Sequence, residues 1–83
     1  MIYYVYMLKS KGVKSVTYVG YTNNLTKRID QHNTGKGAKF TRGRKWILAY
    51  SVGYNSKSKA MSEEYKLKKN FKLRNKIKSN FYK

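Results

Sequence analysis

The stretch TYVGYTNNLTKRIDQH, residues 17–32, decides how this chain is expected to fold. Residues 16–21 (VTYVGY) are rich in β-branched and aromatic side chains, which predicts a strand. Gly20, near the end of this strand, indicates a bulge or a close approach of the backbone. Asn23 or Asn24 can then cap a helix. Three residues of that helix fall on one side at helical spacing: Leu25, Ile29 and His32.

Two further strands are expected on either side of this stretch. Residues 2–8 (IYYVYML) form an apolar run that predicts a largely buried strand. Residues 9–15 (KSKGVKS) carry a glycine and no apolar periodicity, which is typical of a hairpin-like connection. Residues 46–54 (WILAYSVGY) are the third strand candidate.

The remaining segments predict a basic loop and further helices. Residues 33–37 (NTGKG) end the first helix, and residues 38–45 (AKFTRGRK) form the basic loop. Ser56 or Ser58 can cap a helix over residues 59–69, and residues 71–77 either continue that helix or form a short separate one. The expected order is ββαβα(α), an α+β domain with a small three-stranded antiparallel sheet flanked by helices.

Length and composition limit the classes of protein to consider. The 83 residues, 1–83, are expected to form a single domain. The chain contains no cysteine, so it has no disulfide framework. The first residues lack the features of a signal peptide, and no apolar run approaches the roughly 20 residues that span a bilayer. We therefore expect a cytoplasmic protein that does not act at a membrane.

The charge points to a polyanionic partner. Twenty Lys and Arg residues face three acidic residues, which gives a net charge of +17. Such a surplus raises the local concentration of polyanions and speeds their association with the protein. Most of the basic residues are lysine, which suits contact with phosphates better than bidentate reading of bases. DNA, or alternatively RNA, is therefore favoured over an anionic membrane.

The few acidic residues limit where a divalent metal can bind. Asp30, Glu63 and Glu64 are the only carboxylate side chains. Adjacent helical residues point about 100° apart, so at most one of the glutamates can face a given site. Glu64 lies toward the apolar side of its helix, whereas Glu63 is better placed to pair with Lys59 and Lys66. An inward carboxylate and a simple lysine pairing are both compatible with this pattern.

Arg28 and His32 stand four residues apart, so their side chains project from the same helical face. A guanidinium group matches phosphate oxygens, and an imidazole titrates near neutrality. By itself such a pair is more often part of an exposed basic face, or includes a histidine packed at a helix–sheet boundary, than part of a phosphate site.

The order of these segments resembles the GIY-YIG endonuclease superfamily, particularly its short single-domain bacterial members, which are related to the N-terminal incision domain of the excision-repair nuclease UvrC. Residues 4–6 (YVY) match the first motif of the family and residues 18–20 (YVG) match the second. The stretches that follow in the short family are similar to residues 22–33, 35–39 and 60–68. The resemblance covers residues 2–69, and it implies a three-stranded antiparallel sheet flanked by helices.

The resemblance also implies roles for the two motifs. Tyr6 would orient or deprotonate the attacking water, as is proposed for the tyrosine of the first motif. Tyr18 would line the site and contact the scissile phosphate or the water. Gly20 would allow the backbone to come close there. Tyr4 stands where the family has the glycine of the first motif, but Tyr6 is retained.

Three more catalytic residues follow from the same resemblance. Arg28 would stabilise charge on the phosphate, His32 would assist proton transfer, and Glu64 would hold one Mg²⁺ or Mn²⁺ ion. The implied reaction is one-step in-line hydrolysis of a phosphodiester, without an organic cofactor. Asn70 or Asn75 could correspond to an asparagine that some family nucleases use, and their spacing does not choose between them.

These inferences lead to the hypothesis of a metal-dependent DNA endonuclease that acts on branched, nicked or damaged DNA in repair or recombination. The alternative is a non-catalytic nucleic-acid-binding module of the same fold. We expect a monomer or a weak dimer. The five catalytic candidates should converge on one concave basic surface. Basic residues that flank the site in the helix and the loop are candidate contacts to nucleic acid: Lys27, Lys36, Lys39, Arg42 and Arg44.

Overall fold

Strands and helices follow one another in the predicted order. The computed structural model describes residues 1–12 and 15–81. Its elements are β1 (Tyr3–Ser10), β2 (Thr17–Thr22), α1 (Leu25–Asn33), the short 3₁₀ turn η1 (Lys39–Thr41), β3 (Trp46–Tyr54), α2 (Lys57–Lys69) and α3 (Phe71–Phe81).

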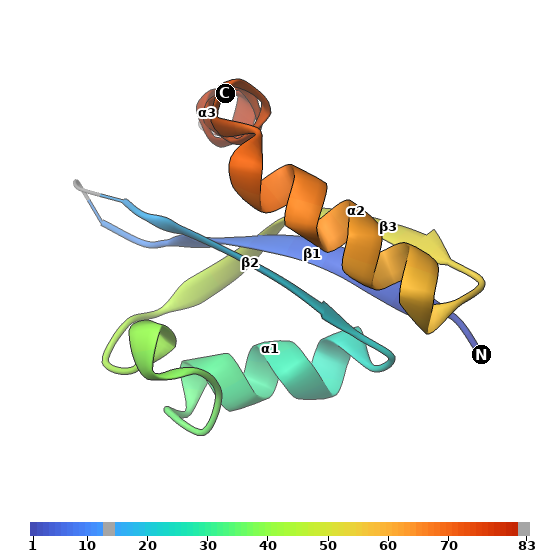
Figure 1. Cartoon of the computed structure of the whole chain (residues 1–83). Coiled ribbons are helices and arrows are strands. Elements are labelled where there is room, and N and C mark those ends of the chain that lie inside the picture. The colour runs from blue at the N-terminus through green and yellow to red at the C-terminus, as the bar shows by residue number, and fades with distance from the viewer. Residues whose placement is uncertain (13–14, 82–83) are drawn as a thin grey trace.

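The strands form one antiparallel sheet in the order β2-β1-β3, so the first strand of the chain is the central one. Helix α1 lies on one face of this sheet, while α2 and α3 lie on the other (Figure 1). The predicted fold class is therefore confirmed. The pairing of β1 with β2 places Tyr6 directly opposite Gly20.

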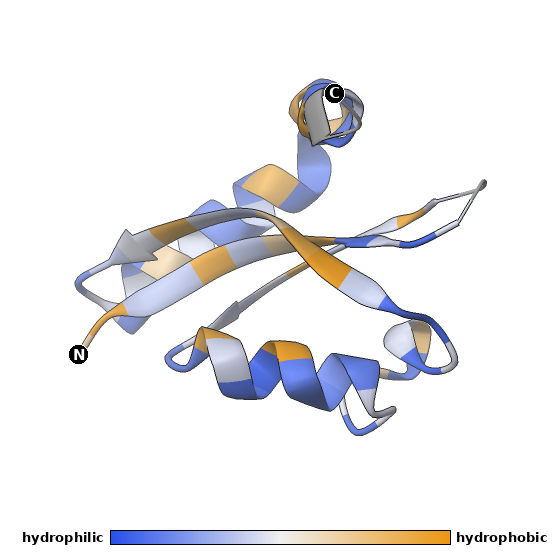
Figure 2. Ribbon diagram, turned by 180° about the vertical axis from the view of Figure 1, so that it is seen from behind, coloured by the Kyte–Doolittle hydropathy of each residue, from blue (hydrophilic) through white to orange (hydrophobic). Residues whose placement is uncertain are grey.

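The central strand divides its side chains between two small cores, because successive residues of a strand point to opposite faces. Val5 and Met7 pack with Ala60 and Leu67 of α2. On the other face, Tyr6, Leu8 and Trp46 form a second cluster, against which Leu25 and Ile29 of α1 pack. Figure 2 shows hydrophobic residues along the strands, whereas much of each helix is hydrophilic. The first sequence motif thus has its tyrosine on the α1 face of the sheet.

Most element boundaries differ only slightly from the predicted ones. Strand β3 covers residues 46–54 as predicted, whereas β1 extends to Ser10 and so takes in the start of the predicted connection 9–15. Residues 13–14 of that connection lie outside the described residues. The predicted loop 38–45 contains the turn η1.

Side-chain caps fix the helix boundaries. The side chain of Asn24 accepts a hydrogen bond from the Lys27 amide, which starts α1. Ser56 caps α2, which therefore starts at Lys57, two residues before the predicted start. Asn70 lies between α2 and α3, and its side-chain oxygen accepts from the Leu73 amide at 3.1 Å. The last segment is consequently a separate helix and not a continuation of α2.

No helix in the described part of the chain combines the length and the apolar character that crossing a membrane requires.

Candidate active site

The centre of the candidate site is a hydrogen bond between Tyr6 of β1 and His32 of α1. Both side chains lie between the sheet and α1. Tyr6 projects from the central strand toward α1, and His32 projects from the last turn of α1 toward the sheet. The Tyr6 Oη and His32 Nε2 atoms are 2.8 Å apart. Both side chains are buried, with exposed fractions of 1% for Tyr6 and 0% for His32. Two residues that lie far apart in the sequence are therefore directly coupled inside the domain.

Thr41, in the turn η1, fixes the protonation pattern of this pair. Its Oγ1 atom lies 2.9 Å from His32 Nδ1 and donates to the Ala38 carbonyl oxygen at 2.8 Å. Since its only proton goes to Ala38, the hydroxyl accepts from His32 Nδ1–H. The Nε2 atom of the neutral imidazole is then free to accept from the phenol of Tyr6. The proton-accepting nitrogen of His32 thus faces Tyr6.

Two glycines make room for the rings of this pair. A β-carbon at Gly20 would lie 2.6 Å from Tyr6 Oη, and a β-carbon at Gly37 would lie 2.5 Å from His32 Nδ1. Both distances are far below van der Waals contact. The pairing of β1 and β2 runs past Gly20 without a register shift, so this glycine serves a close approach and not a bulge. The group that approaches it in the structure is the phenol of Tyr6.

Tyr18 on β2 completes the aromatic cluster. The centre of its ring lies 4.9 Å from that of His32. On its other side it stacks on Phe40 of η1, with 6.2 Å between the ring centres and 22° between the ring planes. Phe40 is 52% exposed, whereas Tyr18 is partly buried. Tyr18 therefore links the buried Tyr6–His32 pair to the protein surface.

Burial favours the neutral form of both members of the pair. Burial raises the pKa of Tyr6; the Arg28 guanidinium opposes this effect, while the Glu64 carboxylate reinforces it slightly. Burial also lowers the pKa of His32, and the charge of Arg28 lowers it further. Arg28 and Glu64 thus both act electrostatically on Tyr6, although they come from helices on opposite faces of the sheet.

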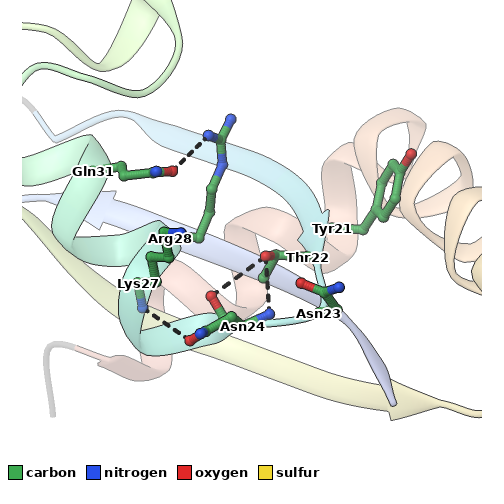
Figure 3. A pocket seen from close by; sticks show the side chains of 7 residues that line it. All are labelled: Tyr21, Thr22, Asn23, Asn24, Lys27, Arg28 and Gln31. Atoms are coloured by element: carbon green, nitrogen blue, oxygen red, sulfur yellow. Dashed lines mark hydrogen bonds between the residues drawn. The ribbon is translucent and has the colours of Figure 1, made fainter. Parts of the chain in front are cut away.

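Arg28 opens onto a pocket of about 480 Å³ between the end of β2 and the start of α1. Its Nη1 atom donates to Gln31 Oε1 at 3.0 Å (Figure 3). Tyr21 also borders the pocket, but its ring points away from it and packs with the core on the α2 face of the sheet (Figure 3). The other residues that line the pocket are polar: Thr22, Asn23, Asn24 and Lys27. Two cations and several amide groups suit this pocket to an anionic ligand.

The two glutamates of α2 are used differently. Glu63 pairs with Lys59 at 3.4 Å and with Lys66 at 3.1 Å, the two lysines with which it was expected to pair. The Glu64 side chain is only 16% exposed and pairs with Lys68 at 3.5 Å. The inward orientation expected of Glu64 is thus combined with a lysine pairing.

A divalent ion at Glu64 would have one protein carboxylate as its ligand. No three His, Cys, Asp or Glu side chains come together within residues 1–12 and 15–81. Mg²⁺ usually keeps several waters and is held through one or two carboxylates together with substrate phosphates. Glu64 therefore fits an ion site that water and a phosphate oxygen complete.

The predicted nucleic-acid contacts all lie at the surface. Each of Lys27, Lys36, Lys39, Arg42 and Arg44 is exposed. The Arg44 guanidinium lies over the Phe40 ring, 5.9 Å from its centre. Of the two asparagine candidates, Asn70 is engaged as a helix cap, and Asn75 lies exposed on α3.

The five catalytic candidates do not share the one concave surface that was expected, because Tyr6 and His32 are buried and Glu64 comes from α2, on the opposite face of the sheet from α1. Tyr6 and His32 are buried because, in so small a domain, their rings supply much of the core between the sheet and α1. The structure brings Tyr6, Tyr18 and His32 into contact and sets Arg28 beside them. Sequence reasoning missed Gly37 and Thr41. Residues 35–41 (GKGAKFT), a glycine-rich stretch that leads into the basic loop, were the sequence signal that could have pointed to them.

The fold and these residues agree with one family of proteins. Residues 2–78 match the family described as the GIY-YIG catalytic domain, which is a nuclease family, and the chain belongs to it. A UPF0213 protein of Oceanobacillus iheyensis is 48% identical over 67 residues, which cover 80% of this chain and 76% of that protein. A UPF0213 protein of Clostridium perfringens is 51% identical over 67 residues, covering 80% of this chain and 70% of the relative.

A solved structure is similar to most of this chain. It is the solution NMR structure of a UPF0213 protein from Bacillus halodurans, which matches with a TM-score of 0.55 and 38% identity. The match covers 95% of this chain and 84% of the other.

Proposed function

We propose that this protein is a divalent-metal-dependent endonuclease that hydrolyses phosphodiester bonds in DNA. The observation that carries the proposal is the 2.8 Å hydrogen bond from Tyr6 to His32 Nε2, with the opposite nitrogen of the imidazole held by Thr41. A buried tyrosine with only a structural role needs some hydrogen-bond partner for its hydroxyl group. It does not need a histidine whose tautomer is fixed by a third residue. Membership of a nuclease family supports the same reading.

The proposed reaction uses Tyr6 and His32 as a proton relay. Water attacks the phosphorus atom, its O–H proton passes to Tyr6 Oη, and the phenolic proton of Tyr6 passes to His32 Nε2. A new P–O bond forms as the bond to the leaving oxygen breaks. Since burial raises the pKa of Tyr6, a free phenolate is unfavourable, and concerted transfer through the phenol avoids it.

The charged residues have separate roles in this proposal. Arg28 binds the non-bridging oxygens of the scissile phosphate, for which its guanidinium is suited, and Lys27 in the same pocket holds a neighbouring phosphate. Glu64 would hold Mg²⁺ or Mn²⁺, an ion that supplies charge stabilisation at the leaving oxygen when it is bound. Tyr18 contacts the phosphate or the water at the edge of the cluster.

The proposed substrate is recognised by its structure and not by its base sequence. The exposed basic residues around the site are mostly lysines, which contact phosphates as point charges. Branched, nicked or damaged DNA offers phosphates in arrangements that a regular duplex lacks. A role in repair or recombination follows from such a preference.

The test is cleavage of nicked, branched and plasmid DNA by the purified protein in Mg²⁺ or Mn²⁺. Glu64→Gln should abolish cutting while binding is kept or strengthened, because a negative charge near the phosphate is lost. Glu63→Gln is the matched control, since it removes the neighbouring carboxylate that pairs with Lys59 and Lys66. Equal loss in the two variants would contradict the role of Glu64.

The second candidate function is a binding module without catalytic activity, on DNA or RNA. The complete burial of His32 and the near-complete burial of Tyr6 favour it, because reacting groups must be reached by water. Tight binding without metal-dependent cleavage of any of these DNA substrates would establish this candidate instead.

A further inference from the structure

Arg74 of α3 has an unusual environment for an arginine. Its Nε atom is buried and has no hydrogen-bond partner within the described part of the chain. Its Nη1 atom donates to Thr17 Oγ1 on β2 at 3.3 Å, and its guanidinium lies over the Phe71 ring, 5.6 Å from the ring centre. The group is therefore held in place while one of its donors remains unused. Buried donors of charged groups are nearly always paired, so this unpaired donor is unusual.

A pocket adjoins this guanidinium at the outer edge of the sheet. It has a volume of about 210 Å³, and its lining combines two cations with residues of the edge strand β2: Thr17, Tyr18, Val19, Lys68 and Arg74. No acidic residue contributes to it. Two cations and a hydroxyl group around a small cavity are complementary to a phosphate group.

The same pocket is connected to the candidate active site through two of its residues. Tyr18 contacts His32 in the aromatic cluster. Lys68 pairs with Glu64 at 3.5 Å. A phosphate held by Lys68 and Arg74 would thus lie near the proposed metal-binding carboxylate. Lys68 and Arg74 come from α2 and α3, which lie on the opposite face of the sheet from α1, the helix of Arg28 (Figure 1).

We propose that Lys68, Arg74 and Thr17 form a second phosphate-binding site, which holds a backbone phosphate of the nucleic acid next to the scissile one. The strand then passes over the free edge of β2, from the Arg28 pocket to this second site. This inference rests on the proposed function for the identity of the ligand. It assigns a substrate role to α3, a helix that supplies none of the five catalytic candidates.

Binding measurements without divalent metal test the site separately from catalysis. The probe is a fluorescent nicked duplex, titrated at several salt concentrations with wild type, Arg74→Gln and Lys76→Gln. Arg74→Gln should weaken binding about three- to tenfold and reduce the slope of log K against log salt by about 0.9, the loss of one phosphate contact. Lys76 is exposed on the same helix, so its variant removes equal charge and should leave the slope nearly unchanged.

Arg74→Lys separates the guanidinium geometry from its charge. It keeps the cation but removes the Nε donor, and it should bind more weakly than wild type. Wild-type binding by Arg74→Lys, or equal slopes for Arg74→Gln and Lys76→Gln, would overturn the site. Thermal unfolding of each variant confirms that the compared proteins are folded.

The Arg74 Nε–H signal provides a direct readout by NMR. It should shift when the nicked duplex is added to the Glu64→Gln variant without metal, and the signal is assigned by its absence in Arg74→Lys. An equal shift with inorganic phosphate alone, at the same low concentration, would overturn the assignment to a nucleic-acid backbone. The remaining outcome is that DNA shifts this signal while the wild-type protein cleaves no DNA substrate with either Mg²⁺ or Mn²⁺. That result would support the second phosphate-binding site and contradict the proposed nuclease activity.

Discussion

A single hydroxyl group, that of Thr41, determines which nitrogen of His32 can accept a proton. The hydroxyl donates to the Ala38 carbonyl and accepts from Nδ1–H, which leaves Nε2 as the acceptor for Tyr6. The imidazole is buried completely, so no water competes for either nitrogen. The tautomer of His32 is thus set by a turn that lies outside the family's two tyrosine motifs.

Replacing Thr41 tests this assignment of the His32 tautomer. Thr41→Val removes the acceptor of the Nδ1 proton, so we expect the imidazole to lose its single tautomer and DNA cleavage to fall by about 10- to 100-fold. Thr41→Ser keeps the hydroxyl and should retain most activity. The ¹⁵N chemical shifts of the His32 ring report the tautomer independently of cleavage. An unchanged Nδ1–H tautomer in Thr41→Val would contradict this account.

At the residue scale, sequence reasoning grouped Tyr6, Tyr18, Arg28, His32 and Glu64 from motif order, and their catalytic roles remain predictions. It could not find Thr41 or Gly37. Both residues contact or make room for His32 because the loop that follows α1 folds back onto it. The conformation of such a loop leaves no periodic pattern in the sequence. The burial of Tyr6 and His32 also depends on packing against α1 and β3, which a strand pattern does not specify.

Among the elements, β2 and the loop after α1 depend on two glycines that act as spacers. Tyr6 occupies the space where a side chain at position 20 would stand, and His32 occupies the space at position 37. Neither glycine has a positive φ, so the requirement is for room and not for backbone conformation. The backbone of β2 at Gly20 and that of the loop at Gly37 can therefore lie directly against the rings of Tyr6 and His32.

Gly20→Ala and Gly37→Ala should each displace the ring that they face. We expect a loss of about 1–3 kcal/mol in the free energy of unfolding, because overpacking forces side chains out of position. The Tyr6–His32 hydrogen bond should lengthen, with a fall in cleavage larger than the fall in stability explains. Denaturant unfolding and cleavage assays measure the two effects.

Ser51→Ala is the matched control for these glycine variants. Ser51 is exposed on β3 opposite Tyr6, and its replacement should change stability by no more than about 0.5 kcal/mol. If Gly20→Ala is as stable and as active as this control, the phenol does not need the space.

Element order was predictable because the strands and the helix caps have local signatures. The apolar runs marked the strands, and two pairs of candidate caps marked the helix starts; the structure uses Asn24 and Ser56 of these pairs. The separation of α2 from α3 was left open, since it depends on the conformation of Asn70 between two lysine-rich helices. The place of β1 at the centre of the sheet was not predicted, because the pattern of a strand does not specify which strands it pairs with.

On the scale of the whole molecule, the protonation of one buried histidine links stability to pH. The folded protein lowers the pKa of His32 below 6.5, through burial and the charge of Arg28. The unfolded chain therefore binds more protons than the folded one as the pH falls below 6.5. Folding stability is highest above this value and declines as the pH drops toward the folded-state pKa.

Denaturant unfolding between pH 7.5 and pH 5 should reveal this decline. We expect the midpoint to fall as the pH decreases, before the glutamates titrate, and NMR titration of His32 should give a pKa below 6.5. A stability that is flat across this range, together with a His32 pKa of 6.5 or above, would contradict the effect of burial.

The central position of β1 has a consequence for how the protein is made. This strand is synthesised before β3, yet its pairing with β3 joins Tyr3 to Tyr54 and Ser10 to Trp46. Trp46 also exchanges two hydrogen bonds with Asn33 at the end of α1, at 2.6 Å and 3.1 Å. A nascent chain that ends before β3 holds Tyr6 and His32 without the strand that closes their core. The hydrogen-bonded pair of Tyr6 and His32 therefore reaches its folded arrangement only after β3 has been synthesised.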